Sequence, residues 1–128
     1  MSVTVDVRIE FDPGFLQRLE KAKQTALEMT GEALRGDLIL SQTMPMDTGH
    51  LQNESTFVDT SVIGLMRLVS STPYARRLYF NPEFNFRTDK NPFAGGRWFD
   101  PYLPGHAKGN FIPQTYAHFL DQQLGGWP

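Results

Sequence analysis

The chain contains no cysteine among its 128 residues. This absence excludes disulfide bridges, a catalytic thiolate and thiolate metal ligands. A large excess of positive or negative charge is also lacking, because 12 basic and 14 acidic residues leave a formal net charge of -2. Such a chain has no overall field to attract nucleic acid or an anionic membrane. No hydrophobic run approaches the roughly 18 residues of a membrane span, and the N-terminus lacks a signal-peptide pattern.

Motifs for metal and nucleotide binding are missing as well. The three histidines, His50, His106 and His118, lie in different contexts, and no pair has the spacing of a zinc-binding helix. No glycine-rich phosphate-binding loop occurs. We therefore expect no catalytic residue, no metal, no cofactor, no small-molecule substrate and no membrane partner.

What is present is the composition of one soluble globular domain, residues 1–128, with 40% hydrophobic and 20% charged residues. The two parts of the chain differ. All but three of the aromatic residues, and seven of the nine prolines, lie in residues 73–128. We expect a strand, a long helix and a hairpin in residues 1–72, and an aromatic-rich loop region with a C-terminal helix in residues 73–128.

The N-terminal residues alternate strictly between apolar and polar side chains. This period of two, with mostly β-branched residues on one face, predicts a half-buried strand. Its apolar face consists of Val3, Val5, Val7, Ile9 and Phe11.

A long helix is predicted from Asp12-Pro13, an N-cap followed by proline, to about Thr43. About 30 helical residues would span about 45 Å, more than one small sheet covers. Its apolar stripe therefore faces either its own sheet alone or partly another subunit. Gly31 and Gly36 indicate either a bend or a close approach of another backbone.

The remaining elements are shorter. The sequence predicts a hairpin for residues 55–59 and 65–70. It also predicts one or two helical turns for residues 74–80 and a last helix for residues 111–124. The fold class is therefore α+β: a small, mostly antiparallel sheet packed against one long helix, with a shorter C-terminal helix and a long loop rich in aromatic residues, proline and glycine.

Between the long helix and the hairpin lies the stretch Pro-Met-Asp-Thr-Gly-His-Leu, residues 45–51. Proline disfavours a helical conformation in the residue before it, Asp and Thr side chains hold turns, and glycine permits a positive φ. We expect a structural turn at the end of the helix. Its residues are Pro45, Asp47, Thr48, Gly49, Leu51 and Ser55.

Asp47-Thr48-Gly49 is also the tripeptide of retroviral-type aspartic proteases, in which two such loops supply paired carboxylates. A chain of this length would have to form a dimer to supply the pair. However, the residues before Asp47 are polar and broken by Pro45, not a buried strand. The dimeric protease is therefore an alternative, and we expect Asp47→Asn to leave the function intact.

The stretch from Asn81 to Trp98 contains four large rings among prolines and glycines. Rings exposed on a subunit mark an interaction surface. We therefore predict a loop or β-arm that becomes ordered only against a neighbouring subunit; the alternative is a β-excursion packed on the core. A nucleic-acid-binding module that uses Arg76, Arg77 and nearby rings is a further alternative. The candidates for a subunit interface are Tyr74, Arg76, Arg77, Phe84, Phe86, Phe93 and Trp98.

The order of these features resembles the minor capsid and head–tail joining proteins of tailed bacteriophages. The resemblance covers residues 3–102 and combines a strand, a long helix, Pro-x-Asp-Thr-Gly-x-Leu, a hairpin and Tyr74-Ala75. Trp98 lies where the minor capsid subfamily carries a tryptophan. Gln52 stands where an arginine is common, and the Glu-x-Gly that often follows Tyr-Ala is absent.

The resemblance implies a structural protein rather than an enzyme. Such a protein assembles as a ring in the head–tail connector, or neck, and joins the DNA-filled head to the tail. Its partners would be copies of itself and neighbouring head or tail proteins, with no specific nucleic-acid sequence. Its location would be the virion, after assembly in the cytoplasm of the bacterial host.

Overall fold

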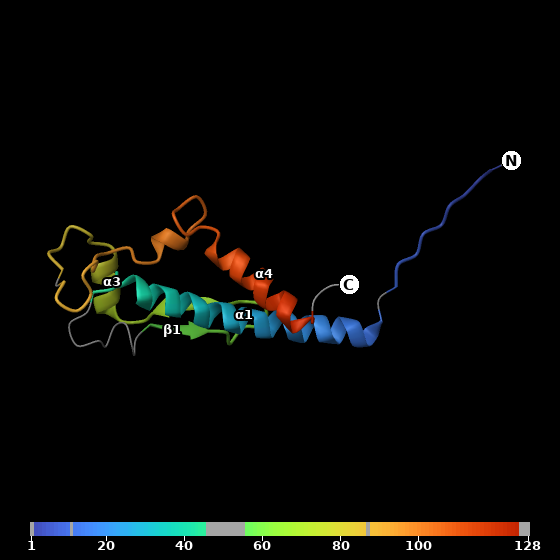
Figure 1. Ribbon diagram of the computed structural model, residues 1–128, viewed down its shortest axis with the longest axis horizontal. Coiled ribbons are helices and arrows are strands. Elements are labelled where there is room, and N and C mark those ends of the chain that lie inside the picture. The colour runs from blue at the N-terminus through green and yellow to red at the C-terminus, as the bar shows by residue number, and fades with distance from the viewer. Residues whose placement is uncertain (1, 11, 46–55, 87, 126–128) are drawn as a thin grey trace.

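The computed structural model describes residues 2–10, 12–45, 56–86 and 88–125. One long helix carries a small sheet and a second, shorter helix (Figure 1). These elements confirm the α+β prediction. In chain order they are α1 (Pro13–Ser41), β1 (Thr56–Asp59), β2 (Arg67–Ser70), α3 (Pro73–Tyr79), a 3-10 turn (Asp100–Tyr102) and α4 (Phe111–Gln123).

Helix α1 begins and ends where its sequence signals lie. Asp12 is the N-cap, and its carboxylate accepts a hydrogen bond from the Gly14 N–H at 3.3 Å, with Pro13 in the first turn. Gln42 takes a left-handed conformation with φ 58°, and its N–H bonds the Ile39 carbonyl. This bond satisfies one of the carbonyl groups left free at a helix end. The predicted long helix is confirmed.

The hairpin lies beside the middle of α1 rather than along its full length. β1 and β2 pair antiparallel, with Thr56 opposite Ser70. The Gly64 N–H at the hairpin turn donates to Gln24 Oε1 at 3.0 Å, and Arg35 Nε donates to the Thr56 carbonyl at 2.9 Å. The hairpin therefore follows about 16 Å of helix between Gln24 and Arg35, at 1.5 Å per residue. The predicted hairpin is confirmed.

Gly31 marks the close contact between this hairpin and α1. A Cβ atom at this position would lie 2.5 Å from Val58 Cγ1 and 3.0 Å from Met66 Cγ. A close approach is therefore found at Gly31, but side chains of the hairpin make it rather than the expected backbone. At Gly36 a Cβ atom would meet no atom within 4 Å, so packing does not require a glycine there.

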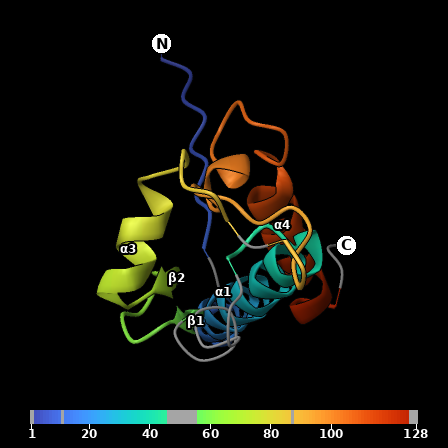
Figure 2. The same ribbon diagram turned by 90° about the vertical axis from the view of Figure 1, so that its left-hand side faces the viewer.

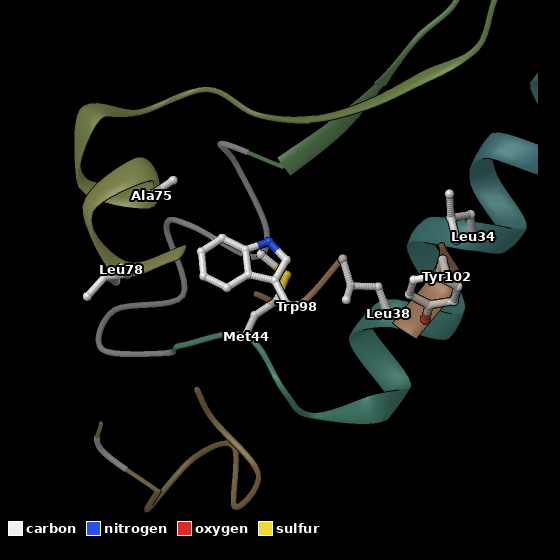
Figure 3. Packing of buried hydrophobic residues seen from close by; sticks show 7 residues of the cluster. All are labelled: Leu34, Leu38, Met44, Ala75, Leu78, Trp98 and Tyr102. Atoms are coloured by element: carbon white, nitrogen blue, oxygen red, sulfur yellow. The ribbon is translucent and has the colours of Figure 1, made fainter. Parts of the chain in front are cut away.

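The hydrophobic core gathers at the C-terminal end of α1. Its central residue is Trp98, which is 2% exposed and packs edge-on against Tyr79, with ring centroids 4.9 Å apart. Residues from α1, α3 and the following loop converge on it (Figure 3). The core therefore joins segments far apart in the sequence. The buried cluster comprises Leu34, Leu38, Met44, Ala75, Leu78, Trp98 and Tyr102.

The aromatic stretch between α3 and Trp98 is folded onto this core. Asn91 is buried, and its Nδ2 donates to the Met44 carbonyl at 2.8 Å. The Gly95 N–H bonds the Thr43 carbonyl at 3.0 Å. The prediction that this stretch needs a neighbouring subunit to pack against is therefore wrong here. Its packing surface comes from the end of α1 and from α3, so a larger sheet is not required.

Helix α4 runs back along α1, on the side opposite the hairpin and α3 (Figure 2). Phe111 and Ile112, at its start, pack against the buried cluster. The connection before α4 is tied to α1, because Tyr102 Oη donates to Asp37 Oδ2 at 2.6 Å and Lys108 Nζ donates to the same oxygen at 2.8 Å. The predicted C-terminal helix is confirmed.

The N-terminal segment, residues 2–10, differs from its prediction. It extends away from the start of α1 (Figure 1) and belongs to no strand. Val3, Val5, Val7 and Ile9 are 76–88% exposed, and within the described residues the sheet consists of β1 and β2. The prediction of a half-buried strand in the subunit's own sheet is therefore wrong. An alternating pattern shows which side chains share a face, but it does not locate their partner.

Candidate assembly surfaces

The turn motif begins inside the described part of the chain and continues beyond it. Met44 and Pro45 are both buried where the chain leaves α1. The other motif residues, Asp47, Thr48, Gly49, Leu51 and Ser55, lie outside the described residues. The turn geometry and the protease alternative, which depends on Asp47, therefore stay predictions.

Helix α3 presents arginines to solvent because its apolar residues face inward. Ala75 and Leu78 are buried in the core, three residues apart on one side of the helix. Arg76 and Arg77 are consequently turned outward and are exposed, as is Tyr74. These three interface candidates lie on the surface of the subunit.

Exposed aromatic rings flank the arginines. The Arg77 guanidinium lies over the Phe84 ring, 5.6 Å from its centroid, and the Arg97 guanidinium lies over the Phe80 ring at 5.5 Å. Such contacts contribute about 0.5–1 kcal/mol at exposed sites, so they orient these side chains while leaving them accessible. We call Arg76, Arg77, Phe80, Phe84 and Arg97 the arginine–aromatic patch.

A pocket of about 450 Å³ opens beside this patch. It lies between the end of β2 and α3, and the indole of Trp98 contributes to its lining. Ser70 and Arg76 bring polar atoms, while the other lining residues are apolar or aromatic. The pocket therefore suits an apolar side chain with a polar neighbour. Its lining comprises Ser70, Ala75, Arg76, Tyr79, Phe80, Trp98 and Phe99.

The structure divides the four aromatic candidates of the loop region into two groups. Trp98 is 2% exposed and Phe86 packs against the buried cluster. The prediction of Trp98 as an interface residue is wrong, because its ring is buried among partners in its own subunit. Phe86 is only partly buried, so its role at an interface stays a prediction. Phe93 is 69% exposed and Phe84 is 36% exposed, so both remain interface candidates.

Sequence reasoning did not single out every exposed apolar group. Phe80 is the C-cap residue of α3 and is 55% exposed; it follows Arg76 by four residues, and this helical spacing was the available signal. Val62 and Ile63, at the hairpin turn, are 55% and 87% exposed. They fall within a segment that the turn pattern assigned to a connection, and because connections generally run over the surface, that assignment was the available signal.

Two tyrosine–aspartate hydrogen bonds, Tyr79 to Asp100 and Tyr102 to Asp37, connect segments of the fold. Burial and a hydrogen bond to Asp100 raise the pKa of Tyr79 far above its ordinary value, and burial with a hydrogen bond to Asp37 does the same for Tyr102. Burial also raises the pKa of Asp37, but hydrogen bonds from Lys108 and Tyr102 and the charge of Lys108 outweigh it, so this pKa lies below the ordinary value. Both tyrosines therefore stay protonated as donors to charged carboxylates.

Across the described ranges, no three His, Cys, Asp or Glu side chains gather closely enough to hold a metal ion. The described helices include none that is both long and apolar enough to cross a membrane. Comparison with family models, curated proteins and solved structures found no match to the chain. Function is therefore inferred from the motif order and from the surfaces described above.

Proposed function

We propose that the protein is a structural component of the head–tail connector of a tailed bacteriophage, where it forms a ring that joins the DNA-filled head to the tail. The order of Pro45, Asp47-Thr48-Gly49, Leu51 and Tyr74-Ala75 supports this proposal, because it resembles minor capsid and head–tail joining proteins. The protein would be assembled in the bacterial cytoplasm and function in the virion.

The observation that carries the proposal is the apolar surface exposed at both ends of one subunit. Residues 2–10 leave one end with four apolar side chains in water, and the arginine–aromatic patch lies at the other end (Figure 1). Exposed apolar groups gathered in this way mark interaction surfaces. Because the two ends differ, a contact between them is heterologous, and repeated contacts of this type close into a ring when the rotation permits.

Such a contact would be driven mainly by burial of side chains. Each large apolar side chain that leaves water contributes about 1.5–3 kcal/mol, and the cost of association and side-chain ordering reduces the net affinity. The surfaces not used between subunits, such as Phe93 and the turn carrying Val62 and Ile63, are available to neighbouring head or tail proteins. No reaction is needed for this role.

Particles produced without the protein test the proposal directly. We expect negative-stain electron microscopy to show filled heads and finished tails that remain separate. Supplying the wild-type protein should restore joined particles. Normal joined phage in its absence would contradict the connector role.

Nucleic-acid binding is the second candidate, favoured by three arginines beside two exposed rings in the patch. Two of these arginines already engage partners: Arg77 lies over Phe84, and Arg97 lies over Phe80 and 3.8 Å from Asp100. We expect no measurable binding to single- or double-stranded DNA at physiological salt. Tight binding that weakens steeply with added salt would favour this candidate instead.

A further inference from the structure

We propose that residues 2–10 of one subunit add as a third strand to the free edge of β2 in a neighbouring subunit. This inference rests on the proposed ring assembly and identifies the segment that makes the contact. Strand addition to an exposed sheet edge is a common mode of protein recognition, in which main-chain hydrogen bonds provide affinity and alternate side chains provide specificity.

The donor segment has the pattern of a strand, and among the described residues it pairs with no other strand. Its apolar face, formed by Val3, Val5, Val7 and Ile9, is at least 76% exposed at every position. The opposite face carries Thr4, Asp6, Arg8 and Glu10. A strand with one apolar and one polar face fits the edge of a sheet that has one covered and one open face.

The acceptor edge belongs to β2. β2 pairs with β1 on one side, and within the described residues its other edge has no backbone partner. The edge of β1 is less open, because the Thr56 carbonyl already accepts from Arg35 Nε. A hairpin of two strands is marginal alone, and a third strand stabilises such a sheet.

The surroundings of β2 match the two faces of the donor. Leu68 and Ser70 lie on the side that faces the core, and the apolar pocket of about 450 Å³ begins at Ser70. Arg67 lies on the opposite, exposed side. An added strand would place its valines toward the pocket and its acidic residues, Asp6 or Glu10, toward the Arg67 guanidinium.

A second copy is the occupant that the position of the segment favours. The segment leaves α1 at Pro13, about 16 Å of helix before Gln24, where the hairpin turn is bound, and it runs away from the hairpin (Figure 1). Asp12 precedes proline and is extended, with ψ 128°. A compact type I turn centred there, which would fold the segment back onto its own hairpin, is disfavoured.

Disulfide trapping between full-length subunits tests this arrangement. Because the natural chain has no cysteine, each bond is unambiguous. One set of subunits carries Thr4→Cys, Asp6→Cys or Arg8→Cys, and a second, tagged set carries Arg67→Cys on the same face of the extended sheet. After mixing and oxidation, at least one pair should give a mixed dimer on a non-reducing gel. Val5→Cys and Val7→Cys are matched controls, since they face the other side and should give little mixed dimer.

The contradicting outcomes differ for the two proposals. If native mass spectrometry shows a closed ring but none of the three pairs gives a mixed dimer, strand addition is wrong and ring assembly stands. If a chain carrying both cysteines forms the bond within one subunit, the segment folds onto its own hairpin and strand addition between subunits is wrong. A protein that is monomeric at all concentrations and gives no mixed dimer overturns both proposals.

A charge on each face gives a second readout. Val5→Asp should weaken association at least about tenfold, because it introduces an unpaired carboxylate into an apolar contact. Thr4→Asp adds the same charge to the polar face and should change association much less. Equal effects of the two variants would contradict the assigned faces.

Discussion

The N-terminal segment and the aromatic stretch both differ in burial from what their sequences predict, and in opposite directions. Residues 2–10 have the pattern of a sheet strand, yet they lie in solvent. Residues 81–98 contain the prolines and glycines typical of a loose surface loop. Trp98 nevertheless lies at the centre of the core, and Asn91 is buried. The difference shows that local pattern determines the shape a segment adopts, while its burial depends on whether another segment lies within reach.

The two ends of α1 explain why the outcome differs. Leu34 and Leu38, near its C-terminus, are covered because the chain returns there through α3 and the aromatic stretch. Near its N-terminus, Leu16 is 44% exposed. The aromatic stretch therefore packs on an apolar surface of its own subunit. The N-terminal segment joins α1 at the other end, where much less apolar surface is available for packing.

Removing the central ring of the core should have the largest effect. Trp98→Ala is expected to lower the free energy of unfolding by about 3–5 kcal/mol, because it deletes a fully buried aromatic side chain. Phe93→Ala, in the same stretch but mostly exposed, should change it by less than about 1 kcal/mol. Urea denaturation of both variants measures the difference. Similar small losses would show that the aromatic stretch is not core.

The hairpin contact on α1 is tested by a pair of glycines. Gly31→Ala is expected to cost about 1–3 kcal/mol, because the new methyl group overlaps Val58 and Met66. Gly36→Ala should stabilise the protein by up to about 1 kcal/mol through helix propensity. Thermal unfolding of both variants provides the measurement. A stabilised Gly31→Ala variant would mean that the hairpin does not pack at this point.

The tie between α1 and the chain before α4 predicts a pH dependence. The folded-state pKa of Asp37 lies below its ordinary value of 3.8, so its contribution to stability is present above that pH and is lost as the pH falls through the folded pKa. Asp37→Asn should cost about 1 kcal/mol at pH 7, since the pair is partly exposed. The difference from wild type should shrink below about pH 4. A difference that is constant from pH 7 to pH 3 would contradict this tie.

The N-terminal segment should contribute least to the stability of the subunit. Val5→Asp is expected to change the free energy of unfolding of the monomer by no more than about 0.5 kcal/mol, because Val5 is 84% exposed. Urea denaturation, at a protein concentration too low for assembly, measures this free energy. A loss of several kcal/mol would mean that the segment packs within its own subunit.

Much of the fold follows from local signals in the sequence. Asp12-Pro13 marks the start of α1, and the turn residues between the two strands mark the hairpin. Gly31 signals a close contact without naming the partner. The position of Trp98 could not be predicted, because it depends on a loop that returns to the end of α1 through bonds such as Asn91 to Met44. The arginine–aromatic patch was only partly predictable, since Arg97 contacts Phe80 across sixteen intervening residues of the chain.

Hydrogen exchange, followed by mass spectrometry on the free subunit and on the assembled ring, tests the central comparison most directly. In the free subunit we expect the amides of residues 2–10 to exchange without protection, while those of Gly95 and Arg97, which bond the Thr43 and Tyr79 carbonyls, are protected. In the ring, residues 2–10 should become protected and the aromatic stretch should change little. Protection of residues 2–10 in a proven monomer, with rapid exchange at Gly95 and Arg97, would contradict the account.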